Sequence, residues 1–401
     1  KGFVKLLDDY VKPVGQLFLY AIFMMVVPLL FSALVMGVSE LGDAKRVGRI
    51  GVRSLLMTVL LSGIAVLLGL GAINLFNPAS GLTQEQRSEL AARYSDKAEA
   101  EKRLKQAETP PDDPPLLGIV PKNPLKEAVR ALEGGLLPFM FFALVFGIAL
   151  GSIEQEKALP VKAFLDGIFA VSLKVIDFAM RFAPIGVFAL VFYAVSVMGI
   201  DLLLAVGKYV ILVIFLLAFH QFVVYSLVLK FIAKRNPLQF FRQIRTVMMT
   251  AFATSSSNAT LPYALRSSEY ELGIPRNIGS FVLTVGATAN QNGTALFEGV
   301  TILFLASMFG VTLDLSQQLM VMGLAIVAGV GTAGVPGGAW PMIAIILVRL
   351  GVPAEGIGLV FGVDRILDMS RTVLNVTGDI TIAACVAQME GQGEQAPEDV
   401  G

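Results

Sequence analysis

Long apolar runs constrain this chain more than any other feature of its sequence. Seven segments are apolar over roughly the length that a helix needs to cross a membrane, about 20 residues. They are Pro13–Val38, Ser54–Phe76, Gly134–Ile153, Phe164–Val197, Leu202–Phe231, Ile278–Phe309 and Ile357–Ala387. The sequence therefore predicts an all-α polytopic membrane protein.

The composition excludes several other classes of protein. Charged residues make up 15% of the chain, whereas soluble proteins carry about 25%. The 31 basic and 31 acidic residues balance, so binding to nucleic acid is not expected. One cysteine (Cys385) and one histidine (His220) provide no disulfide framework, no Cys/His metal site and no catalytic Cys–His pair.

Charge also indicates how the chain is oriented. The basic stretches Lys45–Arg53 and Lys230–Arg245 are expected in the cytoplasm by the positive-inside rule. Between residues 85 and 113, 14 of 29 residues are charged. This insert comes one crossing after the first basic loop, so we expect it outside, as a solvated helix or a disordered loop.

Two further apolar segments are interrupted midway. Phe240–Ala253 ends at a polar tip, Thr254–Asn258, and Leu319–Val330 ends at a glycine-rich tip, Gly331–Gly338; each resumes afterwards. Arms of about a dozen residues are too short to cross a membrane but long enough to enter it and turn back. Paired interruptions point to the binding site of a transporter. The alternative is an ordinary loop between short helices.

The last apolar run carries polar residues at helical spacing. At 100° per residue, Asp364, Asp368, Arg371, Asn375 and Asp379 fall within an arc of about 80°. An ionised group inside a bilayer is costly unless it is paired or solvated, so such residues normally line a site or a pathway. The alternative is a structural network in which the aspartates and the arginine neutralise each other.

The chemistry of this polar stripe favours an acidic amino acid and a coupling ion. A guanidinium such as that of Arg371 binds a carboxylate through two parallel hydrogen bonds. Asp368, one turn away, can accept from an ammonium group, and Asn375 offers its amide to a second carboxylate. Asp379 has no basic partner in its own helix and can bind a small hard cation, which prefers oxygen ligands.

The preceding run is interrupted by Asn290-Gln291-Asn292-Gly293. Polar residues and glycine inside an apolar run indicate an unwound stretch whose carbonyl groups can coordinate ions. Asparagines that merely form hydrogen bonds between helices are the alternative.

Four motifs make the chain resemble the glutamate/aspartate transporter family, also called dicarboxylate/amino acid:cation symporters. Ser255–Pro262 is similar to the tip of the family's first re-entrant hairpin, and Gly331–Gly337 to that of the second. Asn290–Thr294 resembles the unwound Asn-Met-Asp-Gly-Thr of the seventh helix, and Asp368–Asp379 resembles the eighth helix. Weaker similarity covers nearly the whole chain.

The resemblance implies an elevator-type fold with inverted repeats and two re-entrant hairpins, as a homotrimer in the cell (inner) membrane. It implies a transporter and not an enzyme, no cofactor beyond a coupling ion (sodium, with a proton as the alternative), and contacts with an acidic amino acid and membrane lipid.

The expected domains are a scaffold helix (1–47, without the family's first helix), a transport-domain helix (48–81), a polar extracellular insert (82–117), scaffold and trimerisation helices (118–200), a transport domain (201–390) and a polar tail (391–401). Within the transport domain we expect hairpin 1 at 236–270, the unwound helix at 272–310, hairpin 2 at 315–350 and the last helix at 354–389.

The resemblance also implies roles for individual residues. It assigns the side-chain carboxylate of the substrate to Arg371 and the amino group to Asp368. Further substrate contacts fall on Asn375, Thr372, Thr294, Ser257 and Val335. One sodium site comprises Asp379, Asn290, Gly286 and Asn375, and a second comprises Thr288, Val330 and Thr332.

Departures from the family pattern alter these expectations. Asn292 stands where the family has an aspartate, and Leu61-Ser62 where it has Thr-Ser. An amide oxygen can coordinate a cation but cannot neutralise it, so the innermost sodium site, around Asn292 and Ser62, is expected to be absent or weakened. Fewer sodium ions, proton coupling and loss of ion dependence are all compatible with this. Arg365 lies one turn before a position where relatives have a substrate-binding arginine, and it either replaces that arginine or pairs with a neighbouring aspartate.

Three other functions fit these residues less well. A C4-dicarboxylate symporter would place Asp368 against a substrate that has no amino group, which is repulsive. A neutral amino-acid exchanger does not need Arg371. An intramembrane hydrolase could use Asp364 with Asp368 or a serine of Ser255–Ser257, but a serine nucleophile needs a base, and His220 lies in another span.

Overall fold

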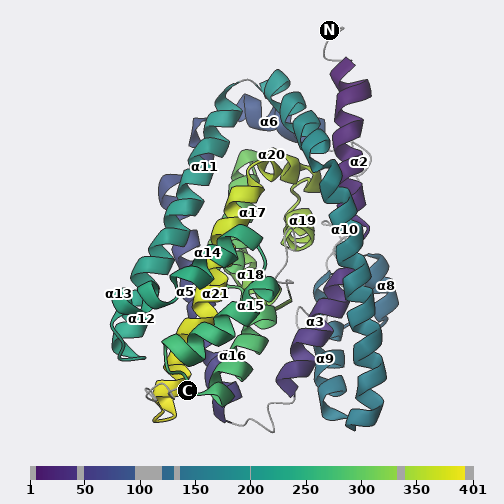
Figure 1. Ribbon diagram of the computed structural model, residues 1–401. Helices are drawn as coiled ribbons and strands as arrows, with labels where there is room; N and C mark the ends of the chain where they lie inside the picture. The colour runs from purple at the N-terminus through teal and green to yellow at the C-terminus, as the bar shows by residue number, and fades with distance from the viewer. Residues whose placement is uncertain are drawn as a thin grey trace.

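The computed structural model describes residues 6–42, 49–94, 120–130, 136–198, 200–331 and 339–392. Helices account for nearly all of this part of the chain, and it contains no strand. The predicted all-α class is therefore confirmed. Figure 1 shows the helices in two groups that lie side by side.

The first group is built around one long helix. Its members are η1 (Leu7–Val11), α2 (Lys12–Phe23), α3 (Val26–Gly42), α8 (Pro124–Val129), α9 (Leu136–Ser152) and α10 (Gln155–Met198). α10 packs against α2 and α3, and α3 packs against α9. The expected single span Pro13–Val38 is two helices, because the ring of Pro28 clashes with the carbonyl group four residues earlier, at Met24.

The second group contains the motif-bearing segments. Its main helices are α5 (Arg49–Phe76), α6 (Gln84–Tyr94), α11 (Ile200–Phe219), α12 (Tyr225–Phe231), α13 (Pro237–Gln243), α14 (Arg245–Thr254), α15 (Ser257–Arg266), α16 (Arg276–Ala289), α17 (Asn292–Met308), α18 (Leu315–Gly331), α19 (Trp340–Arg349), α20 (Gly358–Phe361) and α21 (Asp364–Met389). Single turns join some of them: η2 (Pro78–Gly81), η5 (His220–Val224), η6 (Ser267–Glu271) and η7 (Ala354–Ile357).

The first interrupted segment is a break between two helices. α14 ends at Thr254, and Ser255 adopts the left-handed conformation (φ 52°) that reverses the chain. Ser256 then caps α15 by accepting a hydrogen bond from the backbone N–H of Ala259, at 3.2 Å. α14 and α15 pack against each other and against α21. The second tip, between α18 and α19, falls at residues 332–338, outside the described residues.

The other interruption also lies where the sequence predicts it. α16 ends at Ala289, Asn290 and Gln291 are not helical, and α17 begins at Asn292. The last long helix, by contrast, begins later than expected, at Asp364 instead of residue 354. The short η7 and α20 precede it, in a stretch where Gly358 and Gly362 lower the helical propensity.

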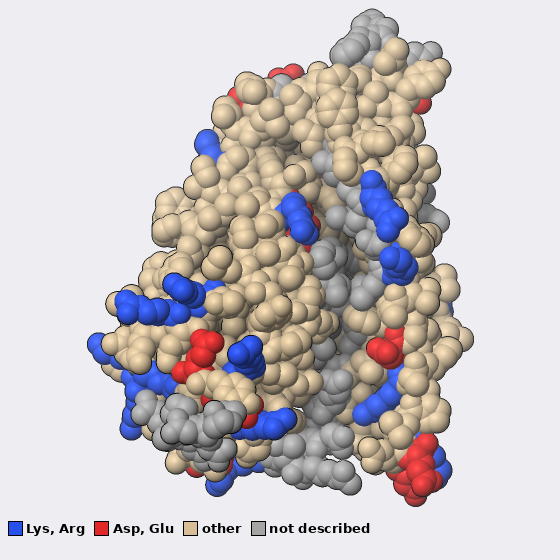
Figure 2. All heavy atoms as spheres, in the orientation of Figure 1, with Lys and Arg blue, Asp and Glu red and all other residues tan. Residues whose placement is uncertain are grey.

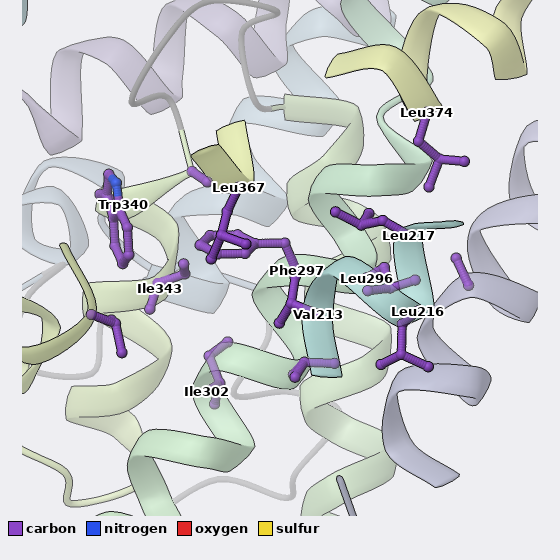
Figure 3. Close-up of a cluster of buried hydrophobic side chains, with 14 of the residues drawn as sticks. Val213, Leu216, Leu217, Leu296, Phe297, Ile302, Trp340, Ile343, Leu367 and Leu374 are labelled. Atoms are coloured by element: carbon purple, nitrogen blue, oxygen red, sulfur yellow. The ribbon is translucent and has the colours of Figure 1, made fainter. Parts of the chain in front are cut away.

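α17 lies at the centre of the buried core. Every one of its residues from Asn292 to Ala306 is buried, which is typical of a helix surrounded on all sides. Figure 3 shows Leu296, Phe297 and Ile302 of α17 among side chains from α11, α19 and α21. This position brings the polar beginning of α17 against the polar stripe of α21.

The start of the charged insert is a docked helix. In α6, Arg87 donates hydrogen bonds to the carbonyl groups of Ala79 at 2.7 Å and Ser307 at 2.6 Å. These bonds join α6 to the end of α17. Residues 95–119 of the insert lie outside the described residues.

Three helical segments in the described part are long and apolar enough to cross a membrane: Arg49–Gly81, Ile200–Phe231 and Asp364–Met389. Shorter apolar helices, among them Pro138–Ser152 and Leu315–Gly329, accompany them. Figure 2 shows uncharged side chains over most of one face, with Lys and Arg gathered toward the end where α12 and α13 lie. This distribution agrees with the basic loops that the sequence assigns to one side of a membrane.

Candidate functional site

The polar stripe of α21 is buried along its whole length. Asp364, Asp368, Arg371, Asn375 and Asp379 are each at most 5% exposed. α21 packs against α14, α15, α16 and α17, so both the first interrupted segment and the broken helix lie beside it. The five residues that the helical spacing places on one face of the helix are therefore all buried, and this face points into the protein.

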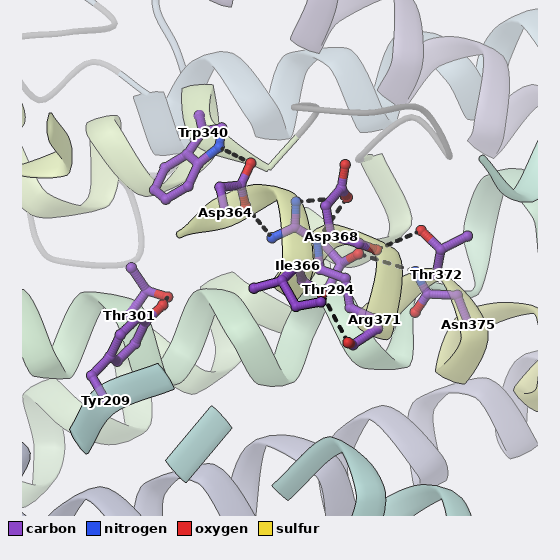
Figure 4. Close-up of polar contacts among 11 residues, drawn as sticks. Tyr209, Thr294, Thr301, Trp340, Asp364, Ile366, Asp368, Arg371, Thr372 and Asn375 are labelled. Atoms are coloured by element: carbon purple, nitrogen blue, oxygen red, sulfur yellow. Dashed lines mark hydrogen bonds and ion pairs between the residues drawn. The ribbon is translucent and has the colours of Figure 1, made fainter. Parts of the chain in front are cut away.

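Arg371 lies between two carboxylates (Figure 4). Its Nε and Nη2 both donate to Oδ1 of Asp368, at 3.1 and 2.8 Å, and its Nη1 forms an ion pair with Oδ1 of Asp364 at 3.2 Å. The guanidinium also lies over the ring of Phe297, 4.1 Å from its centroid. This pairing, the structural alternative considered for the stripe, is present, and it makes a buried guanidinium tolerable.

Asn375 joins the stripe to the beginning of α17. Its Oδ1 accepts from the backbone N–H of Gly293 at 2.7 Å, and its Nδ2 donates to Gln291 and, at 3.1 Å, to the hydroxyl of Thr294. Thr372, on the neighbouring turn, donates to the carbonyl group of Asp368 at 2.8 Å. The helix break thus supplies polar groups directly to the predicted substrate residues.

Asp379 lies beside a small cavity. Asn290 donates from Nδ2 to Oδ1 of Asp379 at 2.6 Å, and its own buried Oδ1 has no hydrogen-bond partner in the described part of the chain. The cavity has a volume of about 20 Å³, which is enough for one water molecule or a small ion. Oxygen atoms of this kind suit a hard cation. Gly286 is required here, because a Cβ atom at its position would collide with the carboxylate of Asp379.

Asn292 belongs to a separate chain of neutral hydrogen bonds. Ser62 donates to its Oδ1 at 2.6 Å, and its Nδ2 donates to the hydroxyl of Tyr225 at 3.0 Å. Tyr225 donates in turn to the carbonyl group of Leu374, at 3.0 Å. The two residues of the expected weakened site are therefore in contact, and the amide oxygen of Asn292 already accepts a hydrogen bond.

Other predicted site residues lie apart from this network or cannot be placed. Ser257 is buried at the start of α15, and its hydroxyl finds no hydrogen-bond partner among the described residues. Thr332 and Val335 lie outside the described residues, and so do the side chains of Thr288 and Val330.

The interpretation that Arg365 pairs with a neighbouring aspartate is wrong. The side chain of Arg365 is exposed, and no ion pair joins it to a described residue. Asp364 and Asp368 both pair with Arg371 instead. The physical reason is competition and burial: Arg371 lies within the buried stripe and already pairs with both aspartates, whereas Arg365 lies at the exposed edge of the helix. The same exposed position does not bring Arg365 to the predicted substrate residues in the place of the arginine that relatives have there.

Two buried polar residues escaped the sequence analysis, and one of them contacts the site. Trp340, at the start of α19, is 1% exposed and donates from its indole Nε1 to Oδ2 of Asp364 at 2.7 Å. Glu298 is a fully buried acid within α17. Glu298 could have been found from the sequence, because it is an acidic residue inside an apolar run. The contact between Trp340 and Asp364 could not, because no residue near Trp340 in the sequence indicates it.

Known proteins match this chain over nearly its full length. A family model described as "Sodium:dicarboxylate symporter family" matches residues 2–389. A "Proton/sodium-glutamate symport protein" of Bacillus subtilis (strain 168) is 36% identical over 387 residues, which cover 96% of this chain and 87% of the relative. A "Proton/glutamate-aspartate symporter" of Escherichia coli (strain K12) is 32% identical, covering 96% and 86%. A "C4-dicarboxylate transport protein" of Anaeromyxobacter sp. (strain K) is 28% identical, covering 96% and 85%.

Proposed function

The chain belongs to the sodium:dicarboxylate symporter family, so it is a membrane transporter and not an enzyme, and we propose that it carries an acidic amino acid together with a cation. The observation that carries the proposal is the buried Arg371 flanked by Asp364 and Asp368. A guanidinium recognises a carboxylate, and an adjacent aspartate recognises an ammonium group. An acidic amino acid carries both groups.

The charge of the buried interior explains why a cation accompanies the substrate. The buried charged side chains of the described part comprise four carboxyl groups (Glu298, Asp364, Asp368 and Asp379) and one guanidinium (Arg371). With every carboxyl group ionised, these five residues carry a net charge of −3. An acidic amino acid adds a further negative charge, and burying it there is costly unless cations or protons enter with it. Coupling to a cation thus follows from electrostatics.

We assign the substrate contacts as follows. The Nε and Nη2 edge of Arg371 binds the side-chain carboxylate, and Asp368 binds the amino group. Asn375 and Thr372 contact the amino-acid backbone groups, and Thr294 assists at the side-chain carboxylate. Ser257 and Val335, at the two hairpin tips, complete the site.

The coupling ion is assigned to the oxygen-rich regions of the same bundle. One sodium site comprises Asp379, Asn290, Gly286 and Asn375, and the unpartnered Oδ1 of Asn290 beside the cavity supports it. A second sodium site comprises Thr288, Val330 and Thr332. The site around Asn292 and Ser62 is weak, because both side chains are neutral and hydrogen-bonded to each other. A proton is the alternative coupling ion.

The wider architecture is also part of this proposal. The domain boundaries expected from the sequence would make 48–81 and 201–390 a transport domain and 1–47 and 118–200 a scaffold, with the insert 82–117 outside the cell. The protein would be a multi-pass homotrimer of the cell (inner) membrane that works as an elevator, with re-entrant hairpins and inverted repeats. The packing of α10 against α2 and α3, and of α3 against α9, supports a scaffold of this kind.

Uptake of radiolabelled aspartate into proteoliposomes tests the proposal. Sodium and proton gradients are imposed separately, and unlabelled glutamate, succinate and serine compete for uptake. We expect gradient-driven uptake that glutamate inhibits and serine does not. Transport of succinate without transport of aspartate or glutamate would favour the C4-dicarboxylate alternative instead. Liposomes without protein, and a collapsed gradient, are the controls.

A further inference from the structure

Trp340 is the single tryptophan of the chain, and it lies against the proposed substrate site. Its side chain is 1% exposed. Its ring meets the ring of Phe297 edge-on, with centroids 5.5 Å apart, and it also packs beside Phe361 at 5.0 Å. Since Phe297 in turn supports the guanidinium of Arg371, the indole lies one side chain away from the proposed carboxylate receptor.

The polar edge of Trp340 fixes Asp364. The indole N–H donates to Oδ2 at 2.7 Å, while Oδ1 of the same carboxylate pairs with Nη1 of Arg371 at 3.2 Å. Asp364 is thus engaged at both oxygen atoms, by a hydrogen bond from α19 and by an ion pair with α21. A hydrogen bond to a charged group in a dry site is among the stronger ones in proteins.

Asp368 is held differently. Its carboxylate receives hydrogen bonds from Arg371 alone among the described residues, both of them at Oδ1. Rotation of this one side chain would free the Nε and Nη2 atoms of Arg371 together. Those two atoms form the edge of the guanidinium that suits bidentate binding of a carboxylate.

We propose that Trp340 is a positioning residue that makes Asp364 the permanent counterion of Arg371 and leaves Asp368 as the exchangeable one. The inference rests on the proposed function, because it assumes that an acidic amino acid binds here. When the substrate arrives, its side-chain carboxylate takes the place of Asp368 at Nε and Nη2, and Asp368 turns to the ammonium group. Asp364 stays bound to Nη1 and to the indole, so Arg371 keeps its orientation throughout.

The native protein provides the first test, because its tryptophan fluorescence comes from Trp340 alone. Because the indole keeps its hydrogen bond to Asp364 when the substrate binds, we expect aspartate, like serine, to leave the emission maximum of the detergent-solubilised full chain nearly unchanged. The Asp364→Asn variant should show an altered emission before any substrate is added. A large emission shift on binding of aspartate, with binding verified independently by radiolabelled aspartate, would mean that the indole changes its partner and would overturn the proposal; an unaltered emission in the Asp364→Asn variant would overturn it as well.

A double-mutant cycle provides the second test. Trp340→Phe keeps an aromatic ring but removes the N–H donor, and we expect it to raise the KM for aspartate uptake about tenfold, with the maximal rate changed less than twofold. Asp364→Asn should weaken aspartate binding as well, and Trp340→Phe added to it should cause little further loss. Independent, additive effects would mean that Trp340 acts by packing alone, which would overturn the proposal.

Aspartate binding by the native protein and by the Trp340→Phe variant separates the proposed function from the role of Trp340. If the native protein binds neither aspartate nor glutamate, the proposed function is wrong and this inference falls with it. If the native protein binds aspartate and the Trp340→Phe variant has the same KM, only the role of Trp340 is wrong. Arg365→Ala, a change at the exposed neighbour of Asp364, is the matched control and should leave the KM unchanged.

Discussion

At the scale of single residues, each charged side chain that is buried needs a partner of opposite charge. Arg371 has two acidic partners and an aromatic ring beneath it, whereas the arginine six residues earlier, Arg365, is exposed. The two arginines share one helix and differ in the face that they occupy. A comparison of variants at the two positions therefore separates recognition of the substrate carboxylate from the general effect of removing a positive charge.

We predict that Arg371→Ala abolishes binding of acidic amino acids, while Arg365→Ala leaves it within about twofold. Removal of the guanidinium deletes the carboxylate receptor and also leaves Asp364 and Asp368 as unpaired buried charges, which costs about 3–5 kcal/mol of stability. Arg371→Lys keeps the charge without the planar fork and is expected to fold better than Arg371→Ala while still binding weakly. Binding of radiolabelled aspartate measures the effect. Unchanged aspartate affinity in Arg371→Ala would disprove the assigned role.

Asn292 is the second residue whose replacement is informative. Asn292→Asp introduces a negative charge beside Ser62, and we expect it to strengthen the response to sodium about tenfold or more. Without sodium the variant should be less stable than the native protein, because an aspartate cannot donate to Tyr225 as Asn292 does. Thermal unfolding in detergent, measured over a range of sodium concentrations, tests both effects. The hypothesis of a weakened site fails if the sodium response is unchanged.

At the scale of helices, the breaks between helices supply polar groups to the site. Ser255 turns the chain between α14 and α15, and Ser256 caps α15. The non-helical Asn290 and Gln291 leave the N–H of Gly293 free to donate to Asn375. In each case a helix terminus exposes polar backbone groups next to α21, where a substrate or an ion can use them.

Close contact between α16 and α21 gives a prediction at this scale. Gly286→Ala should weaken the sodium response and aspartate binding, because its Cβ atom would collide with the carboxylate of Asp379. Alanine otherwise favours a helix over glycine by about 1 kcal/mol. Gly63→Ala in α5 is the matched control, since a Cβ atom there meets nothing within 4 Å. We expect the control to bind normally and to unfold at the same or a higher temperature; equal behaviour of both variants would contradict the prediction.

At the scale of the whole molecule, an ion-pair cluster joins two distant helix ends. Glu390, which follows α21, accepts from Arg49 at 2.7 Å and from Arg53 at 2.6 Å, both on the first turns of α5. The hydrogen bond from Arg49, with the positive charges of both arginines, lowers the pKa of Glu390 below its ordinary value of 4.5. Figure 1 shows that α21 ends at the lower end of the molecule, and Figure 2 shows basic side chains gathered toward that end.

This cluster predicts a pH-dependent contribution to stability. A lowered pKa in the folded state means that the contribution is present above pH 4.5 and is lost as the pH falls through the pKa of the folded protein. Glu390→Gln should therefore lower the unfolding temperature at pH 7, and the difference from the native protein should disappear in acid. Differential scanning fluorimetry at several pH values measures this. A difference that is independent of pH would contradict it.

Much of this protein follows from short stretches of its sequence. The length of the apolar runs determined the helical class, the polar tips determined where helices break, and helical spacing placed five residues of α21 on one buried face. These are properties of neighbouring residues, and local geometry is enough to interpret them. The late start of α21 and the break before Pro28 show that boundaries within apolar runs are less well determined.

The partners of the buried polar groups were decided by tertiary structure alone. Trp340 meets Asp364 from 24 residues away, Tyr225 meets Asn292 from 67, and Ser62 meets Asn292 from 230. No local pattern encodes such pairs, because they depend on how α5, α12, α17, α19 and α21 pack together. The sequence identifies which side chains need a partner inside the protein, since a buried polar group without one is costly; only the packing of the helices decides which partner each one finds.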